Sequence, residues 1–239
     1  MRETFTELWA RLSLQQHIQL SGWQWVILLA LVLLLVLPRP VWRLTGMYST
    51  LVHELGHVLS ALFTGRFVTG LRLGWDHSGE VVSRGRGKMS VIVSGIFGYP
   101  APIWVSAGLL AATAAGYPGL ALGVYALFFC LALVFVRNFP ALVVCVASAL
   151  LALAVVFFAP VTALVYVAML LAGFLLLAGL RDCVKLLSVH LWRRAELRSS
   201  DAYLIARSTG TIASFWLVVI LLAAGAGAWL AGINLLRLI

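Results

Sequence analysis

Charged residues are scarce in this sequence, and acidic residues are the scarcest. Only 10% of the 239 residues are charged, with 8 Asp and Glu against 17 Lys and Arg, while 63% are hydrophobic. Because soluble globular domains carry roughly 25% charged residues, this composition excludes one. The net charge of +9 requires no nucleic-acid partner, since cytoplasmic arginines facing the anionic headgroups of the lipid bilayer account for it. We therefore expect an all-α polytopic membrane protein.

Cysteine is also rare. The three cysteines, Cys130, Cys145 and Cys183, lie in apolar segments or at their ends, and none forms a CxxC pair. This spacing predicts neither a disulfide framework nor a zinc cluster built on cysteine.

Apolar runs long enough to cross a bilayer, about 17 to 25 residues, are abundant. We expect about seven transmembrane helices in a single domain over residues 21–239, with the weakest divisions near Asn138 and Pro160. Residues 1–20 precede this domain and are expected to form an amphipathic segment on the cytoplasmic surface, with an apolar face that extends to Leu14. The expected spans are 21–37, 44–64, 90–114, 119–136, 139–158, 161–180 and 211–236.

The basic residues predict the orientation of these spans, because cytoplasmic loops are enriched in Lys and Arg. With seven spans and a cytoplasmic N-terminus, only Arg39, Arg43 and Arg237 of the 17 basic residues fall outside. We therefore expect the N-terminus to be cytoplasmic and the C-terminus to lie outside.

One short motif is more specific than any other feature: His53-Glu54-Leu55-Gly56-His57, inside the apolar run 44–64. On a helix, His53 and His57 project from one face, where two imidazoles can bind one Zn²⁺ while Glu54 reaches a water on the metal. Ionisable groups at membrane depth are costly to insert without a partner or a function. The motif predicts a zinc hydrolase that works within the bilayer, and a decayed or structural site is the alternative.

Catalytic zinc usually takes three protein ligands, so a third must come from elsewhere in the chain. Asp182 is the preferred candidate, because it ends the run 161–180 at the cytoplasmic end of its span, the half in which the motif also lies. A charge paired with Arg181 or Lys185 is its alternative role. Asp201, just before the last span, is the second candidate, and its alternative role is a helix N-cap.

Two segments near the motif have more than one interpretation. Residues 67–83 alternate partly around a turn-rich centre and predict a cytoplasmic β-hairpin. This hairpin either receives an extended substrate by β-addition or connects two spans along the membrane surface. The Gly/Pro-rich stretch 94–102 indicates either a water-filled cavity or close packing of Gly95 and Gly98 against the motif helix.

Together these features resemble the site-2 protease family of intramembrane zinc metallopeptidases, in its compact bacterial branch without a PDZ domain. The resemblance covers residues 44–216 and includes the HExxH motif, the hairpin, the Gly/Pro-rich span and the segments around Asp182 and Asp201. It implies zinc bound by His53, His57 and an Asp of a later span, with Glu54 as general base, in a bacterial plasma membrane. Many members carry that Asp in an Asn-Pro-x-Pro-x-x-Asp-Gly or Leu-Asp-Gly motif, which this chain lacks.

The expected activity is hydrolysis of peptide bonds in or near transmembrane segments. Glu54 would take a proton from water and later deliver it to the leaving amine. The expected substrates are single-pass or signal-peptide-like segments of membrane proteins. The alternative is a catalytically inactive, metal-binding scaffold or chaperone of the same fold.

Overall fold

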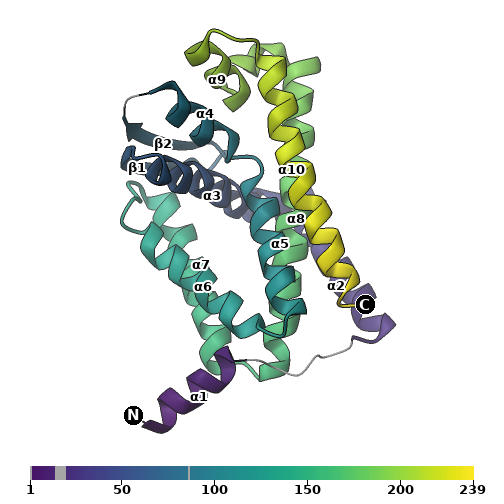
Figure 1. The fold of residues 1–239 in the computed structure, drawn as a ribbon. Helices are drawn as coiled ribbons and strands as arrows, with labels where there is room; N and C mark the ends of the chain where they lie inside the picture. The colour runs from purple at the N-terminus through teal and green to yellow at the C-terminus, as the bar shows by residue number, and fades with distance from the viewer. Residues whose placement is uncertain (1, 14–19, 86) are drawn as a thin grey trace.

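The computed structural model describes residues 2–13, 20–85 and 87–239, and most of them are helical (Figure 1). The expected helical fold with a β-hairpin after the motif helix is confirmed. In chain order the elements are α1 (Arg2–Leu12), α2 (Gly22–Val36), α3 (Arg39–Phe63), β1 (Phe67–Leu73), β2 (Gly79–Arg84), α4 (Lys88–Ile96), α5 (Ala101–Ala114), α6 (Pro118–Ala132), α7 (Phe139–Phe158), α8 (Val161–Leu191), the 3₁₀ helix η1 (Arg194–Ser199), α9 (Asp201–Thr209) and α10 (Ala213–Leu236).

The described helices provide three spans that are long and apolar enough to cross a membrane, namely α7, α8 and α10. Two further candidates are bent pairs: α2 with α3, which meet at 90°, and α4 with α5, which meet at 61°. The apolar helix α6 is shorter, at 15 residues. The structure thus supports three spans, or up to five if each bent pair is one span, and the expectation of seven separate spans is not confirmed.

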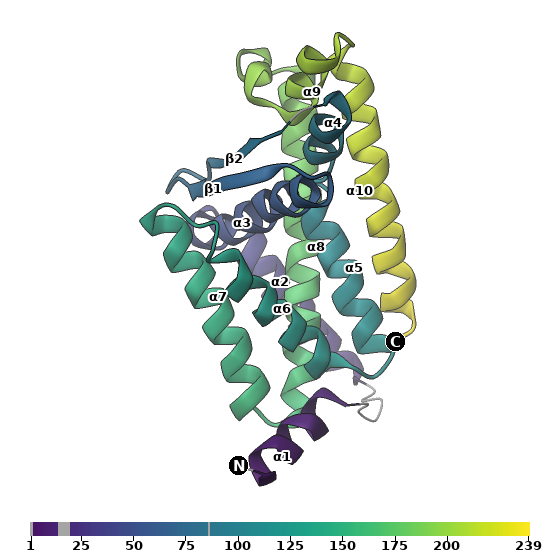
Figure 2. The same ribbon diagram turned by 60° about the vertical axis from the view of Figure 1, so that its left-hand side comes forward.

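The sharp corner between α2 and α3 explains part of this difference. Pro38 precedes α3, and because proline has no amide hydrogen and restricts the residue before it, α2 cannot continue. Arg181 of α8 fixes the corner by donating a hydrogen bond to the carbonyl of Val36, and its guanidinium lies 4.2 Å from the ring centre of Trp42. In both views α3 crosses the bundle of α5, α8 and α10 instead of running along it (Figures 1 and 2).

The helix α3 lies between two layers of the protein. On one side its residues Leu51, Leu55 and Val58 are buried in a core shared with α5, α6, α7 and α8. The sheet, α4 and α9 lie on the other side of α3 from α6 and α7 (Figure 2). The motif helix is therefore held between a helix bundle and a small upper layer.

The hairpin is anchored on one edge only. β1 pairs with β2 in antiparallel fashion, with a register shift between Val68 and Gly70. The outer edge of β1 is joined to the α6–α7 connection, because Leu71 N donates to Phe135 O (2.7 Å) and Arg137 N donates to Leu71 O (2.9 Å). Within the described chain no strand pairs with the outer edge of β2.

The two ends of the chain lie at the same end of the bundle, opposite the sheet and α9 (Figures 1 and 2). This arrangement does not support the expectation that the termini face opposite sides of the membrane. The predicted amphipathic segment is the helix α1, which packs against the bundle through Leu8 and Leu12. Arg11 also donates a hydrogen bond to the carbonyl of Ala159 (2.6 Å). Leu14, predicted on the same apolar face, lies outside the described residues.

Candidate metal centre

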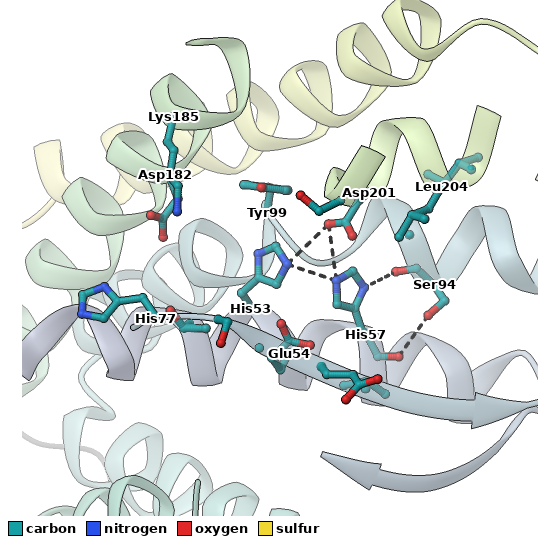
Figure 3. Close-up of a pocket in the computed structure, with 18 of the residues that line it drawn as sticks. His53, Glu54, His57, His77, Ser94, Tyr99, Asp182, Lys185, Asp201 and Leu204 are labelled. Carbon is teal, nitrogen blue, oxygen red and sulfur yellow. Dashed lines mark hydrogen bonds and ion pairs between the residues drawn. The ribbon is translucent and has the colours of Figure 1, made fainter. Parts of the chain in front are cut away.

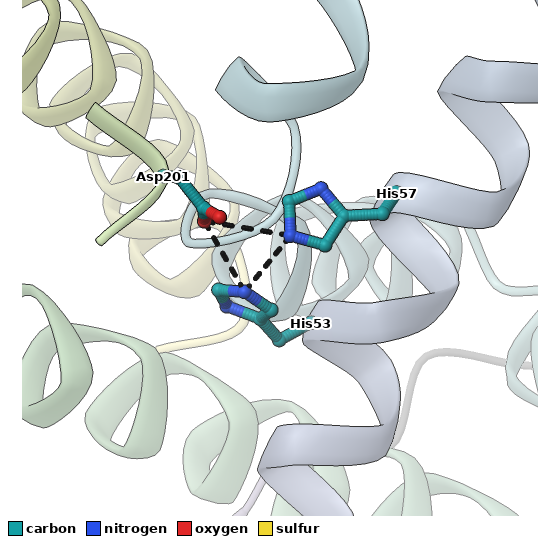
Figure 4. A group of neighbouring side chains, drawn as sticks. All are labelled: His53, His57 and Asp201. Carbon is teal, nitrogen blue, oxygen red and sulfur yellow. Dashed lines mark hydrogen bonds and ion pairs between the residues drawn. The ribbon is translucent and has the colours of Figure 1, made fainter. Parts of the chain in front are cut away.

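The two histidines of the motif point toward one another from α3. The Nε2 atoms of His53 and His57 are 3.1 Å apart. Oδ2 of Asp201 lies 3.4 Å from each of them (Figure 4). All three side chains are nearly buried, with 12 to 15% of each exposed. Three possible metal-ligand atoms thus meet at one point.

Asp201 reaches this point because α9 folds back over α3. Asp201 is the first residue of α9, and the neighbouring Ser200 caps the helix by accepting a hydrogen bond from Tyr203 N (3.3 Å). Ile205 and Trp216 are buried where α9 packs against α10. Because Ser200 provides the cap, the carboxylate of Asp201 is free to face the histidines.

The hydrogen bonding of His57 determines what its Nε2 can bind. Its Nδ1 lies 2.7 Å from the carbonyl oxygen of Ser94. A carbonyl only accepts, so Nδ1 carries the hydrogen and a neutral His57 presents a lone pair at Nε2. That lone pair faces His53 and Asp201 Oδ2, a buried oxygen without a hydrogen-bond partner among the described residues. A cation between these atoms would satisfy all three.

The charge state of Asp201 also suits a metal ligand. Burial opposes ionisation of this carboxyl group, but the positive charge that His57 and His53 carry when they are protonated holds its pKa below the usual range. The group is therefore a carboxylate at neutral pH, as metal binding requires.

The dimensions of the cluster fit zinc. Ligand atoms about 2.05 Å from a tetrahedral Zn²⁺ are about 3.3 Å apart, close to the separations of 3.1 and 3.4 Å found here. Gly98 keeps the adjacent space open, since a Cβ at this position would lie 2.5 Å from Nε2 of His57 and 2.7 Å from Nε2 of His53. The residues present therefore fit the metal that the motif predicts.

The centre opens into a cavity of about 1110 Å³ between α3, the hairpin, α4, α8 and α9 (Figure 3). Glu54 lines this cavity and is 6% exposed. Its Oε1 lies against Gly79, so closely that a Cβ on this glycine would overlap it. The start of β2 therefore lies directly beside the predicted general base.

The structure brings Asp201, the second sequence candidate for the third ligand, to the histidines, and not Asp182, the preferred candidate. Asp182 lies on α8, where its Oδ2 accepts a hydrogen bond from Ser49 Oγ (2.8 Å). Ser49 precedes His53 by one helical turn of α3, so Asp182 is displaced along α3 from the cluster. The sequence could not show this difference, because it depends on η1 and α9 folding over the motif.

Sequence reasoning did not identify Ser94 and Tyr99 as site residues, and it expected Gly98 only as a glycine that packs against the motif helix. The feature of the sequence that pointed to this region is the Gly/Pro-rich stretch 94–102, which forms the break between α4 and α5 and passes over the motif. Tyr99 packs edge to face on His53, with ring centres 4.6 Å apart. Of the two glycines expected to pack on the motif helix, Gly98 does so, whereas a Cβ on Gly95 would meet Ile205 of α9.

A comparison with protein families agrees with this site. The family model described as Peptidase M50B-like matches residues 19–231, a range that includes the motif, the hairpin, Asp182 and Asp201. No curated protein and no solved structure matches the chain. The match covers most of the chain and confirms the predicted relationship to the site-2 proteases. The chain belongs to the Peptidase M50B-like family.

Proposed function

We propose that this protein is an intramembrane zinc metalloprotease that hydrolyses peptide bonds in or near transmembrane segments of other membrane proteins. The observation that carries the proposal is the meeting of His53, His57 and Asp201 beside Glu54 in one cavity. The family of peptidases to which the chain belongs supports hydrolysis, and the apolar helices support a location in the membrane.

Each residue of the centre has a distinct role. His53, His57 and Asp201 would hold the zinc ion, which leaves one position free, as catalytic zinc sites require. Bound zinc supplies Lewis-acid chemistry, because it polarises a carbonyl group and lowers the pKa of water towards 7. Glu54 takes the proton from the attacking water and returns it to the leaving amine.

The substrate would bind as an extended strand along β2. A transmembrane helix must unwind before its peptide bonds can be cleaved, and an extended segment can pair with an exposed strand edge. The outer edge of β2 has no strand partner in the described part of the chain, and β2 begins at Gly79 beside Glu54. A strand added there would run past the metal centre.

The basic residues indicate that the hairpin end of the bundle faces the cytoplasm. The segments at this end, from the hairpin and α4 to the end of α8, η1 and α9, carry most of the Lys and Arg residues. Among the described residues, the basic residues at the opposite end are Arg2 and Arg11 of α1 and Arg237 after α10. Because cytoplasmic segments are enriched in Lys and Arg, both termini would lie outside, in place of the N-in, C-out orientation expected from seven spans.

Zinc content and cleavage together test the proposal. The detergent-purified protein should contain about one zinc per chain, Asp201→Ala should lose it, and Glu54→Gln should keep it. Wild-type protein should cleave reporters that carry a signal-peptide-like or single-pass segment, and Glu54→Gln should not. Zinc without cleavage of any reporter would support the inactive scaffold instead, and a wild-type protein that binds no zinc would overturn the metal centre.

A further inference from the structure

The two histidines of the metal centre differ in how their second ring nitrogens are held. Nδ1 of His57 is hydrogen-bonded to the carbonyl of Ser94. No group among the described residues forms a hydrogen bond with Nδ1 of His53. A metal-binding histidine almost always donates its other N–H to a carboxylate, a carbonyl or water, and this bond fixes the tautomer and orientation of the ring.

Asp182 lies on the side of the cavity that this nitrogen faces. In Figure 3 one nitrogen of His53 points to Asp201, and the other faces the side on which Asp182 lies. Asp182 lines the same cavity and is close enough to His53 to interact with it electrostatically. Its partner Ser49 is four residues before His53, on the same face of α3.

The contacts of Asp182 leave half of its carboxylate available. Oδ2 accepts the hydrogen bond of Ser49, and no described residue donates one to Oδ1. In the described chain Asp182 has no ion-pair partner within 4.0 Å, and the adjacent Arg181 is bonded to Val36 and stacked on Trp42. Asp182 is half-buried, and an acidic side chain on an apolar helix is costly without a partner, but the described residues offer it no ion pair.

We propose that Asp182 accepts a hydrogen bond from Nδ1–H of His53, directly or through one bridging water. This bond would hold the ring in the tautomer that presents the Nε2 lone pair to the metal, while Ser49 holds the carboxylate in place. Asp182 is then a positioning residue for a ligand and not a ligand itself. The inference rests on the proposed zinc centre. It gives a positioning role to Asp182, the residue that the sequence had suggested as the third ligand.

The test is the zinc affinity of the full-length protein in detergent, measured by competition with a chelator. Asp182→Ala should still bind one zinc at saturation, with an affinity 10- to 100-fold lower, as is typical when the partner of a metal-binding histidine is removed. Asp182→Asn keeps an acceptor oxygen and should recover part of the loss. Glu80→Gln removes a negative charge from the β2 side of the same cavity and should bind zinc like the wild type.

A readout of ligand geometry separates positioning from a general effect on folding. The absorption spectrum of the Co²⁺-loaded protein should change in Asp182→Ala and stay unchanged in Glu80→Gln, while both apo variants keep wild-type helix content. Wild-type affinity in Asp182→Ala would overturn the inference, as would loss of all saturable zinc, which would make Asp182 a ligand. An equal loss of zinc affinity in Glu80→Gln would also overturn it, because the effect would then come from the negative charge of the cavity and not from a hydrogen bond to His53. A wild-type protein without zinc would instead overturn the proposed function.

Discussion

Gly98 lies against His57 so closely that a Cβ on this glycine would come within 2.5 Å of both Cε1 and Nε2 of the ring. The same Cβ would lie 2.7 Å from Nε2 of His53. The break between α4 and α5 thus passes directly over the metal-facing nitrogens, where only a residue without a side chain leaves space. The close approach of the two imidazoles therefore favours glycine at position 98.

Gly98→Ala is therefore expected to impair zinc binding more than it impairs folding. The added methyl group displaces the imidazoles from a common point, and a loss of at least 10-fold in zinc affinity should follow. Gly108→Ala is the matched control, because a Cβ on Gly108 meets nothing within 4 Å. Zinc affinity and the thermal midpoint of the apo protein check the prediction, and unchanged affinity in Gly98→Ala would contradict it.

Ser200 and Asp201 are adjacent, but their substitution should have separable effects. Ser200→Ala removes the N-cap of α9 and should lower stability by about 1 kcal/mol, while zinc remains bound. Asp201→Ala removes a proposed ligand and should abolish stoichiometric zinc. Thermal unfolding in detergent and metal analysis on the same samples would distinguish the two. Equal zinc loss in both variants would mean that the position of α9, and not the carboxylate, controls the metal.

Gly79→Ala should affect catalysis without affecting the metal. A Cβ on Gly79 would overlap Oε1 of Glu54, so the general base must move, whereas the histidines are untouched. We expect cleavage of a reporter to fall at least 10-fold, at unchanged zinc content. Gly108→Ala again serves as the control, because a Cβ on Gly108 meets nothing within 4 Å. If Gly79→Ala cleaves at the wild-type rate, the approach of β2 to Glu54 is not important for catalysis.

The outer edge of β2 should contact the substrate. In an inactive Glu54→Gln protein with Cys130 replaced by serine, Val82→Cys should form disulfide crosslinks with a cysteine near the cleavage site of a reporter. Arg72→Cys on β1, the strand that is already covered on its other edge, should crosslink far less. Equal crosslinking at both positions would show that the hairpin is only a connector on the membrane surface.

The local features of the candidate site could be predicted from the sequence, and its long-range assembly only in part. The spacing of His53 and His57 and the turn-rich hairpin are determined by residues close in the chain, so they could be predicted. The carboxylate that joins the two histidines could not be predicted. Asp182 follows one apolar segment and Asp201 precedes another, so the sequence does not distinguish them, and only the folding of α9 over α3 shows which one reaches the histidines.

The expected number of seven spans is not confirmed, for a related reason. Hydropathy measures the length of an apolar run but not its direction. The run 44–64 is apolar enough to cross a membrane, yet the corner at Pro38 and the contact of Arg181 with Val36 turn α3 across the bundle. If α3 does not cross the membrane, every later loop lies on the side opposite to the one that seven spans predict, so an orientation based on counting spans is not supported.

The two orientations, with the N-terminus outside or in the cytoplasm, can be distinguished by a labelling experiment. Single cysteines would be introduced at Arg2, Arg84 and Arg237 in a protein without its natural cysteines, and whole cells would be treated with a membrane-impermeant maleimide. With the hairpin in the cytoplasm and both termini outside, positions 2 and 237 should be labelled, while position 84 should react only after the membrane is opened. The orientation with the N-terminus inside predicts that position 2 is protected and position 237 is labelled, so the label at position 2 decides between the two.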